Sequence, residues 1–222
     1  MNGRASRNRR PGRCASINKR KVMAGRNQLR IIGGEWRGRR LKVVDQPGLR
    51  PTPDRVRETL FNWLAPVIAG SRCLDLFAGS GALGLEAASR GAAFVTLVEK
   101  AGAPARQLRS NIELLQAGDR LVLAPTDALR YLNQPPAEPF DVVFLDPPFS
   151  QGWLARCLPG LAQPGWLAPG AYIYIEAEQD LDSAALQALL PVGWQLVRSR
   201  KSGEVGYHLA RAAGLQTAPQ AS

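Results

Sequence analysis

From residue 72 onward, short apolar runs alternate with segments whose apolar residues recur at helical spacing. The runs at 72–77, 94–99, 121–124 and 141–145 are rich in β-favouring residues, whereas 81–90 and 104–116 have the period of helices. Gly91 stands just past the first of these helices, where a glycine commonly ends a helix. Such alternation predicts a parallel, doubly wound α/β sheet with right-handed crossover connections.

The chain after residue 150 continues this pattern and then changes it. A helix is predicted at 153–161, a strand at 171–176 and a short helix after Asp182. The segment 194–212 has two β-favouring halves around Ser202 and Gly203, which predicts a hairpin. We therefore expect a Rossmann-like, mostly parallel seven-stranded sheet that ends in an antiparallel hairpin. His208, the sole histidine, falls in the last strand, and we interpret it as structural.

The region before the sheet has its own pattern. Two β-favouring runs separated by glycines, within residues 29–44, predict a basic β-hairpin. In the following "RPTPDRVRETLFNWL", Thr52 and Pro53 occupy positions suited to a helix N-cap and a first helical residue. The apolar residues of this segment predict a helix with one face packed inward, and Arg55 and Arg57 are expected to lie off that face.

These patterns divide the chain into four parts. They are a basic tail (1–28), a basic hairpin extension (29–50), a main domain (51–211) and a flexible C-terminal tail (212–222). The first part has no acidic residue and few apolar ones, so it cannot offset the entropy of ordering and is expected to be disordered. Its composition also resembles a mitochondrial transit peptide, and Met23 is an alternative start of translation.

Charge and cysteine content narrow the classes of function. The net charge is +11, and residues 1–60 hold 17 Lys and Arg against 4 Asp and Glu. This asymmetry favours a polyanionic partner, most simply nucleic acid, although arginine-rich ends can also serve solubility alone. No apolar stretch approaches the ~18 residues of a membrane span, and no secretory signal is evident. Three widely spaced cysteines fit neither a disulfide framework nor a zinc site, so we expect a cytoplasmic protein without a metal.

The segment "DVVFLDPPFS", at 141–150, begins with a strand that should be buried on both faces. Pro147 and Pro148 end this strand because neither has an N–H to donate. Asp146 therefore stands at the carboxyl tip of a central strand, the edge where open α/β sheets place ligands. A simple strand-ending turn is the alternative interpretation.

A glycine-rich loop, "FAGSGALG", joins the first strand of the main domain to the first helix. Its spaced glycines, with Glu99 after the next strand, would also suit a dinucleotide. Asp75 precedes the loop and favours S-adenosylmethionine (SAM), because a carboxylate there would repel a pyrophosphate. Asp127 is placed to accept a hydrogen bond from adenine or, alternatively, to cap the next helix. A side chain at Gly81 is expected to fill space that the cofactor needs.

These motifs together resemble class I SAM-dependent methyltransferases that act on exocyclic amino groups of bases. The segments "RIIGGEWRGRRL", "LRPTPDRVRETLFNWL", "CLDLFAGSGALGLEAASRGA" and "FLDPPF" further resemble the RsmD family of bacterial enzymes, from about Leu29 to about Arg211. The resemblance implies methylation of N2 of a guanine in 16S ribosomal RNA, with that RNA or a small-subunit assembly particle as the partner. We also expect a monomer.

The expected site residues form three groups. The cofactor-binding group is Asp75, Phe77, Ala78, Gly79, Gly81, Gly84, Glu99, Asp127 and Ala128. The catalytic group is Asp146, Pro147, Pro148 and Phe149. The group suited to RNA phosphates, with one aromatic for stacking, is Trp36, Arg37, Arg39, Arg40, Arg50, Arg55 and Arg57. One departure from the family pattern is that Lys100 and Ala101 follow Glu99, where a second acid is common.

Methylation of a base amine explains the residues of "DPPF". The lone pair of such an amine is delocalised into the ring, so attack requires two hydrogen-bond acceptors that favour a more tetrahedral nitrogen. The Asp146 carboxylate and the Pro147 carbonyl would supply them, and Phe149 would stack on a base rotated out of its helix. The alternatives are a DNA methyltransferase acting on adenine N6 or cytosine N4, a nicotinamide-dependent dehydrogenase and a non-catalytic RNA-binding protein.

Overall fold

The computed structural model describes residues 28–44, 52–178, 181–203 and 205–213. Residues 1–27 of the predicted basic tail, Arg50, and residues 214–222 lie outside these ranges. The fold continues past the predicted boundary at Arg211, because Ala212 is buried and its N–H donates to the carbonyl of Ala171 at 2.8 Å. The main domain therefore extends slightly further than the sequence pattern indicated.

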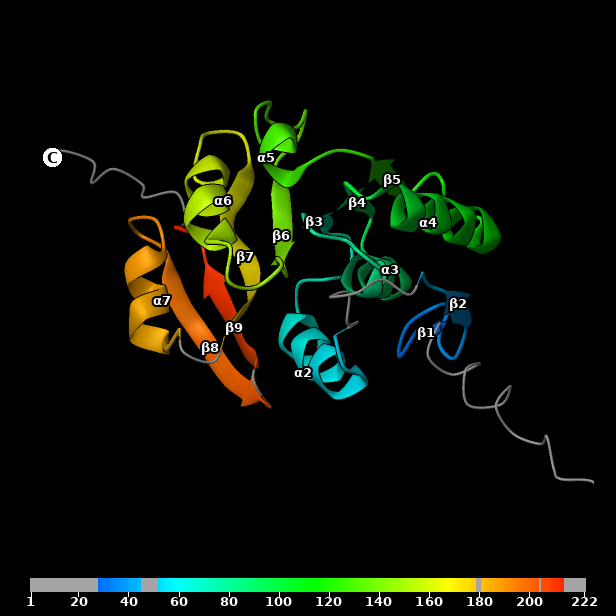
Figure 1. Cartoon of the computed structure of the whole chain (residues 1–222), viewed down its shortest axis with the longest axis horizontal. Helices are drawn as coiled ribbons and strands as arrows, with labels where there is room; N and C mark the ends of the chain where they lie inside the picture. Colours follow the sequence, from blue (N-terminus) through cyan, green and yellow to red (C-terminus); the bar gives the residue numbers. More distant parts are fainter. Residues whose placement is uncertain (1–27, 45–51, 179–180, 204, 214–222) are drawn as a thin grey trace, which may run out of the picture.

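A seven-stranded sheet forms the centre of the molecule, with the strand order β5-β4-β3-β6-β7-β9-β8 (Figure 1). The strands are β3 (Arg72–Asp75), β4 (Phe94–Val98), β5 (Leu121–Ala124), β6 (Phe140–Leu145), β7 (Leu167–Glu178), β8 (Gln195–Ser202) and β9 (Val205–Arg211). β3 to β7 are parallel, and β9 runs antiparallel to both β7 and β8. The predicted doubly wound sheet with an antiparallel C-terminal hairpin is confirmed.

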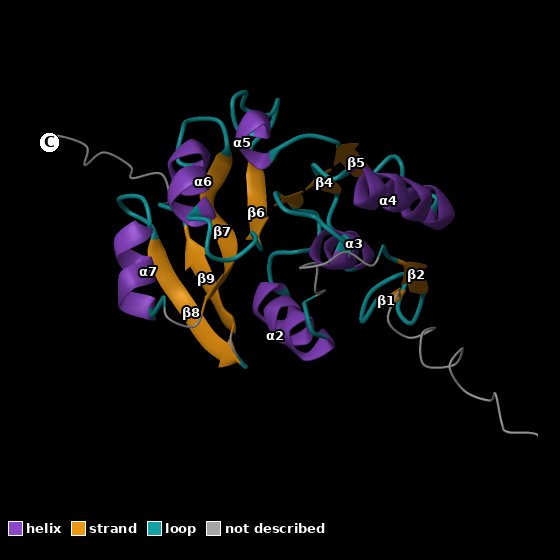
Figure 2. Cartoon of the chain, in the orientation of Figure 1, coloured by secondary structure: helices purple, strands orange, loops and turns teal. Residues whose placement is uncertain are grey.

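Helices pack on both faces of this sheet (Figure 2). α2 (Asp54–Leu64), α3 (Ala82–Ser89) and α4 (Gly102–Leu115) share one apolar cluster, whereas α5 (Ala128–Tyr131), α6 (Trp153–Leu161) and α7 (Ser183–Leu189) share the other. Along β6, Val142 and Phe144 belong to the first cluster, and Val143 and Leu145 belong to the second. This alternation is that of a strand buried on both faces, as predicted for the run before "DPPF".

The predicted N-terminal hairpin is present with short strands, β1 (Gln28–Arg30) and β2 (Arg40–Lys42), paired antiparallel. Its apolar residues Leu29, Ile31, Leu41 and Val43 are buried in the same cluster as α2, α3 and α4. The hairpin is therefore packed into the core of the main domain and does not stand away from it as an extension.

Polar contacts fasten the hairpin to the C-terminal end of α3. The buried carboxylate of Glu86 accepts the backbone N–H of Gly33 and of the residue before it, both at 2.8 Å. The Ser89 hydroxyl donates to the Gly33 carbonyl at 2.6 Å. Gly34 has a φ of +76°, and a Cβ there would lie 1.8 Å from the Ser89 carbonyl oxygen. The two glycines of "IIGGEW" thus let the hairpin backbone lie directly on the helix end.

The predicted cap of α2 is wrong. The helix has Pro53 as its N-cap, and no side chain caps it. The buried hydroxyl of Thr52 lies instead within hydrogen-bond distance of two carboxyl groups of the sheet, Asp146 at 3.3 Å and Glu176 at 3.0 Å. Both carboxyl groups come from strands that are distant in sequence, so a local capping pattern could not reveal them.

Candidate active site

Four acidic residues form a row at the carboxyl edge of the sheet. Asp127, Glu99, Asp75 and Asp146 lie at or just after the ends of β5, β4, β3 and β6, which are neighbours in that order. Because adjacent strands are about 4.8 Å apart, the row spans on the order of 14 Å. The sequence predicted these acids separately, and the sheet brings them to one edge.

The loop after β3 is a tight turn that depends on glycines. Gly79 and Gly81 have φ angles of +51° and +79°, in the left-handed region that favours glycine. The N–H of Gly84 donates to Asp75 at 2.9 Å, and a Cβ on Gly84 would come within 2.2 Å of Leu97. These residues let α3 begin directly against the ends of β3 and β4.

The reason for a glycine at position 81 differs from the prediction. A Cβ there would meet Leu108 at 2.5 Å and Leu85 at 2.8 Å, both inside the protein. A larger residue would therefore disturb the packing between α3 and α4, and the positive φ adds strain. Gly81→Val is a destabilising change and not a clean probe of cofactor binding.

Asp75 is the most deeply buried acid of the row, with 1% of its surface exposed. Its Oδ2 atom accepts the N–H of Gly84, whereas its Oδ1 atom has no hydrogen-bond partner among the described residues. Burial is the main cause that raises the pKa of Asp75 to about 7, and the backbone N–H groups of Gly84 and Phe77 oppose it. An unpartnered oxygen on a buried acid suits a cationic group of a ligand.

Glu99 and Asp127 are less buried, and both hold backbone groups. The Glu99 carboxylate accepts the N–H of Ala101 at 2.6 Å, in addition to the Gly79 N–H at 2.8 Å. Asp127 caps α5 through its own side chain, as the alternative prediction stated, and pairs with Lys100 at 3.3 Å. Burial acts to raise the pKa of Asp127, but the hydrogen bond from Lys100 and backbone N–H groups outweigh it, so the pKa is lowered.

The "DPPF" motif follows β6 as predicted. Pro147 is buried, whereas Pro148 and Phe149 are exposed, and 40% of the Phe149 surface is accessible. Burial raises the pKa of Asp146 well above its ordinary value, and nearby carboxylates raise it further. The motif thus combines a partly buried carboxyl group with an aromatic ring that faces solvent.

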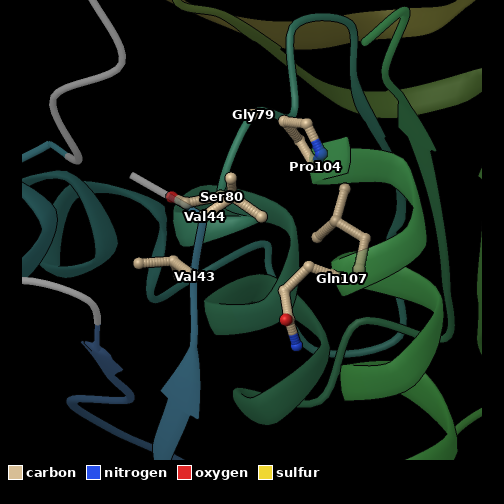
Figure 3. A pocket seen from close by; sticks show the side chains of 7 residues that line it. Val43, Val44, Gly79, Ser80, Pro104 and Gln107 are labelled. Atoms are coloured by element: carbon tan, nitrogen blue, oxygen red, sulfur yellow. The ribbon is translucent and has the colours of Figure 1, made fainter. Parts of the chain in front are cut away.

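A small hollow lies beside the glycine loop (Figure 3). It is lined by Val43, Val44, Gly79, Ser80, Pro104, Gln107 and Leu108. The segment after β2 therefore reaches the glycine loop and α4, a proximity that the sequence did not predict. A wider hollow at the opposite edge of the sheet, around Ser71, Asp141 and Arg211, contains none of the predicted site residues.

The predicted RNA-binding group divides in two. Arg37, Arg39, Arg40 and Arg55 are exposed, as phosphate contacts require. Arg50 lies outside the described residues, and the remaining two members of the group are buried.

Trp36 and Arg57 are therefore wrong as RNA contacts. Trp36 has 2% of its surface exposed, and its ring packs in the core with the Arg120 guanidinium 5.1 Å from its centroid. Arg57 has 1% of its surface exposed and lies 2.6 Å from Asp54 and 3.5 Å from Glu86. The buried carboxylate of Glu86 attracts Arg57 into the protein, which the amphipathic pattern of the helix did not indicate.

Sequence reasoning also missed residues behind "DPPF". Glu176 of β7 is buried, and it accepts hydrogen bonds from the Tyr174 hydroxyl at 2.9 Å and from Thr52. The one available signal was an acid within the otherwise apolar run "AYIYIE". His208, by contrast, is buried beside the Ser199 hydroxyl at 2.9 Å, which is consistent with a structural residue.

A protein metal site usually needs several ligating side chains close together. In the part of the chain that the structure describes, no cluster of three or more His, Cys, Asp or Glu is arranged to hold one. No helix within the same ranges has both the length and the apolar character needed to cross a membrane.

Comparison with known proteins identifies the family. The family model described as "Conserved hypothetical protein 95" matches residues 29–211. Ribosomal RNA small subunit methyltransferase D of Escherichia coli K12 is 50% identical over 186 residues, covering 84% of this chain and 91% of the relative. The chain belongs to the RsmD family. The Haemophilus influenzae relative of the same name is 45% identical, over 83% of this chain and 94% of its own.

Two solved structures agree with this fold. The Escherichia coli protein yhhF has a TM-score of 0.75 and 47% identity, covering 84% of this chain and 98% of its own. A Haemophilus influenzae structure described as a methylase has a TM-score of 0.72 and 41% identity, covering 84% and 99%. The predicted family and the predicted class I methyltransferase fold are confirmed.

Proposed function

We propose that this protein transfers the methyl group of SAM to N2 of a guanine in 16S ribosomal RNA. The observation that carries the proposal is the placement of Asp75 and Asp146 at the ends of neighbouring strands, β3 and β6. The first is a buried acid with an unpartnered oxygen, and the second is a carboxyl group followed by an exposed aromatic ring. One suits a cationic cofactor and the other suits an amine. The shared name of the relatives supports ribosomal RNA as the substrate.

The acid row fits the functional groups of SAM. Oδ1 of Asp75 has no partner among the described residues and would accept a hydrogen bond from the ammonium group of the methionine part. Glu99 lies one strand away and would bind the ribose hydroxyls, and Asp127 lies two strands away and would accept from the adenine amino group. The loop residues Phe77, Ala78, Gly79, Gly81 and Gly84, with Ala128 at the start of α5, would complete the site. When bound, SAM supplies a methyl group on a sulfonium that leaves readily.

The protein's main task at the amine is orientation. Asp146 and the Pro147 carbonyl would accept the two N–H bonds of the guanine amine, and the exposed ring of Phe149 would stack on the base. Alignment in a near-attack geometry contributes ~7–11 kcal/mol, whereas a hydrogen bond to a charged group contributes ~1.5–3 kcal/mol. Positioning therefore outweighs acid–base chemistry, and the two prolines hold the second acceptor on a rigid backbone.

The exposed arginines define the RNA side of the proposal. Arg37, Arg39 and Arg40 lie on the hairpin, and Arg55 lies on α2, whose preceding residue Thr52 contacts Asp146. Arg55 lies close to the catalytic motif, whereas the turn that carries Arg37 and Arg39 packs on Ser89 at the far end of α3 and would contact phosphates further from the rotated base. We propose that the protein acts as a monomer. Naked RNA and a small-subunit assembly particle are the two substrates to compare.

Mass spectrometry of methylated RNA tests the proposed function. Purified protein and SAM are incubated with small-subunit RNA, either naked or in assembling particles, from cells that lack the endogenous enzyme. We expect N2-methylguanine at one position, and Asp146→Ala, which removes the proposed acceptor of the amine, should greatly reduce it. Methyladenine or methylcytosine, or transfer to DNA in place of RNA, would overturn the base and substrate assignment.

A further inference from the structure

The segment before α2 inserts a hydroxyl group between two carboxyl groups. β6 and β7 are paired in parallel with Leu145 opposite Ile175, so the next residues of both strands, Asp146 and Glu176, lie side by side. The Thr52 hydroxyl lies 3.3 Å from Oδ2 of Asp146 and 3.0 Å from Oε1 of Glu176. Thr52 and Glu176 are each 5% exposed, so bulk water has little access to the contacts among the three groups.

Counting protons at this hydroxyl constrains the two acids. A threonine hydroxyl has one proton and donates to one acceptor at a time. Both contacts of Thr52 are hydrogen bonds only if one of the two carboxyl groups is protonated and donates to the hydroxyl oxygen. Two ionised carboxylates at this separation in a buried site also repel each other strongly. The pair therefore holds one shared proton, and the hydroxyl can point toward either acid.

We propose that Glu176 is a positioning residue whose carboxylate, side by side with Asp146 and joined to it through Thr52, controls when Asp146 becomes the ionised acceptor for the target amine. With one proton in the pair, Glu176 accepts from Tyr174 and Thr52, and Asp146 holds the proton and donates it to the Thr52 oxygen. Once that proton leaves, the Thr52 hydroxyl can turn and donate to Oδ2 of Asp146. Oδ1 of Asp146 then remains for the amine. This inference rests on the proposed function, because it assigns a role in amine methylation.

The same arrangement accounts for the proton that the reaction releases. When the nitrogen forms its bond to the methyl carbon, the carbon–sulfur bond breaks and its electron pair stays on sulfur. The nitrogen becomes cationic and loses one N–H proton, which Asp146 accepts. The pair then carries one proton, on Asp146, and releases it to solvent, which restores the ionised acceptor.

The groups facing Asp146 determine how each substitution should change its titration. Burial raises the pKa of Asp146 most, the charges of Glu176 and then Asp75 raise it further, and the Thr52 hydrogen bond lowers it. Burial likewise raises the pKa of Glu176, against hydrogen bonds from Tyr174 and Thr52. Removing Glu176 and removing the Thr52 hydroxyl should therefore shift the ionisation of Asp146 in opposite directions.

The experiment compares pH profiles of single-turnover methylation for the wild type, Glu176→Gln, Thr52→Val and Thr52→Ser. The acidic limb of the profile, where activity falls as pH falls, reports the ionisation of Asp146. Glu176→Gln should move this limb to lower pH by about one unit, the low end of the effect of a nearby charge. Thr52→Val should move the limb to higher pH and reduce the plateau, and Thr52→Ser should restore the wild-type profile. SAM affinity and melting temperature, measured alongside, separate these shifts from a loss of folding.

Two outcomes would overturn the inference. In the first, the acidic limb stays in place in both Glu176→Gln and Thr52→Val. In the second, the acidic limb shifts in the same direction in both variants. Infrared titration of the protonated carboxyl band, without RNA, gives a readout that needs no turnover, and Glu176→Gln should remove one titrating carboxyl group. If the wild type methylates no guanine but this band behaves as expected, the proposed function fails while the shared proton stands.

Discussion

The carboxyl edge of the sheet and the basic hairpin with α2 both present charged residues that the sequence pattern assigned to ligands. At the sheet edge, the four acids predicted from sequence lie in one row on neighbouring strands. In the hairpin and α2, Arg37 and Arg55 are exposed, but Trp36 and Arg57 are buried. The difference arises because the end of a strand fixes where a residue lies, whereas a turn or a first helical turn leaves its side chain free to follow a distant partner.

The largest effect is expected at the sheet edge. Asp146→Ala should reduce methyl transfer by ~10²–10³-fold, the cost of removing one group that stabilises charge in a transition state. SAM affinity should change only a few-fold, because the residue acts on the amine. Single-turnover kinetics and calorimetric titration with SAM measure the two quantities. Near-wild-type turnover would remove Asp146 from the mechanism.

In the hairpin region, the largest effect is expected on stability. Glu86→Ala removes the carboxylate that holds two hairpin N–H groups and lies 3.5 Å from the buried Arg57. An uncompensated buried charge costs ~3–5 kcal/mol, so the free energy of unfolding should fall by about that amount in a denaturant titration. Glu113→Ala, at an exposed position of α4, is the matched control and should change it by less than ~0.5 kcal/mol. Equal effects of the two changes would show that Glu86 does not anchor the hairpin.

The exposed arginines should affect RNA binding but not the fold. Arg37→Ala/Arg39→Ala should weaken RNA binding and reduce the log–log salt slope by ~0.7–0.9 for each phosphate that the variant no longer neutralises. Methylation should partly recover at high RNA concentration, and SAM affinity should stay the same. Arg211→Ala, at an exposed position of β9 outside the hairpin and α2, is the control and should leave the slope unchanged. An unaltered slope in the double variant would exclude the hairpin from RNA binding.

Asp75 should make SAM binding depend on pH. Its pKa is raised from 3.8 to about 7, mainly by burial, so the folded protein holds this proton more tightly than the unfolded chain does. The contribution of Asp75 to the stability of the ligand-free protein therefore falls as pH rises from about 4 to about 7. Affinity for cationic SAM should rise over the upper part of this range, and Asp75→Asn should flatten both trends in melting and titration experiments.

The smallest effect is expected from the N-terminal tail. Deletion of residues 1–22 removes a segment without a core-forming pattern, so SAM affinity should not change. The melting temperature should stay within about 2 °C, which corresponds to ~0.5–1 kcal/mol in a domain of this size. A larger decrease would show that the tail packs on the main domain.

The fold could be predicted because its signals are repeated and local. Each strand and helix of the main domain has its own periodicity, and the strand ends place Asp75 and Asp146 at one edge once the sheet is parallel. Gly79 and Gly84 were also predicted as parts of the loop, although the close approach of Gly84 to Leu97 needed the structure.

The errors concern residues whose partners are distant in sequence. Thr52 had a favourable local role as a helix cap, but its partners Asp146 and Glu176 lie 94 and 124 residues away. Arg57 lies off the apolar stripe of α2, yet the buried Glu86 attracts it inward. No periodicity within one element reports such a pair, so the sequence alone could not place these side chains.

The attachment of the hairpin to α3 sets a condition for engineering. A designer who grafts the hairpin alone onto a different methyltransferase would transfer residues 28–44 without the parts that hold them. Glu86 and Ser89 supply the acceptors and donors for the hairpin backbone, and Arg57 lies beside the Glu86 carboxylate. A working transplant therefore has to include the end of α3 and the start of α2, so the smallest exchangeable unit is a composite of three separate stretches of chain.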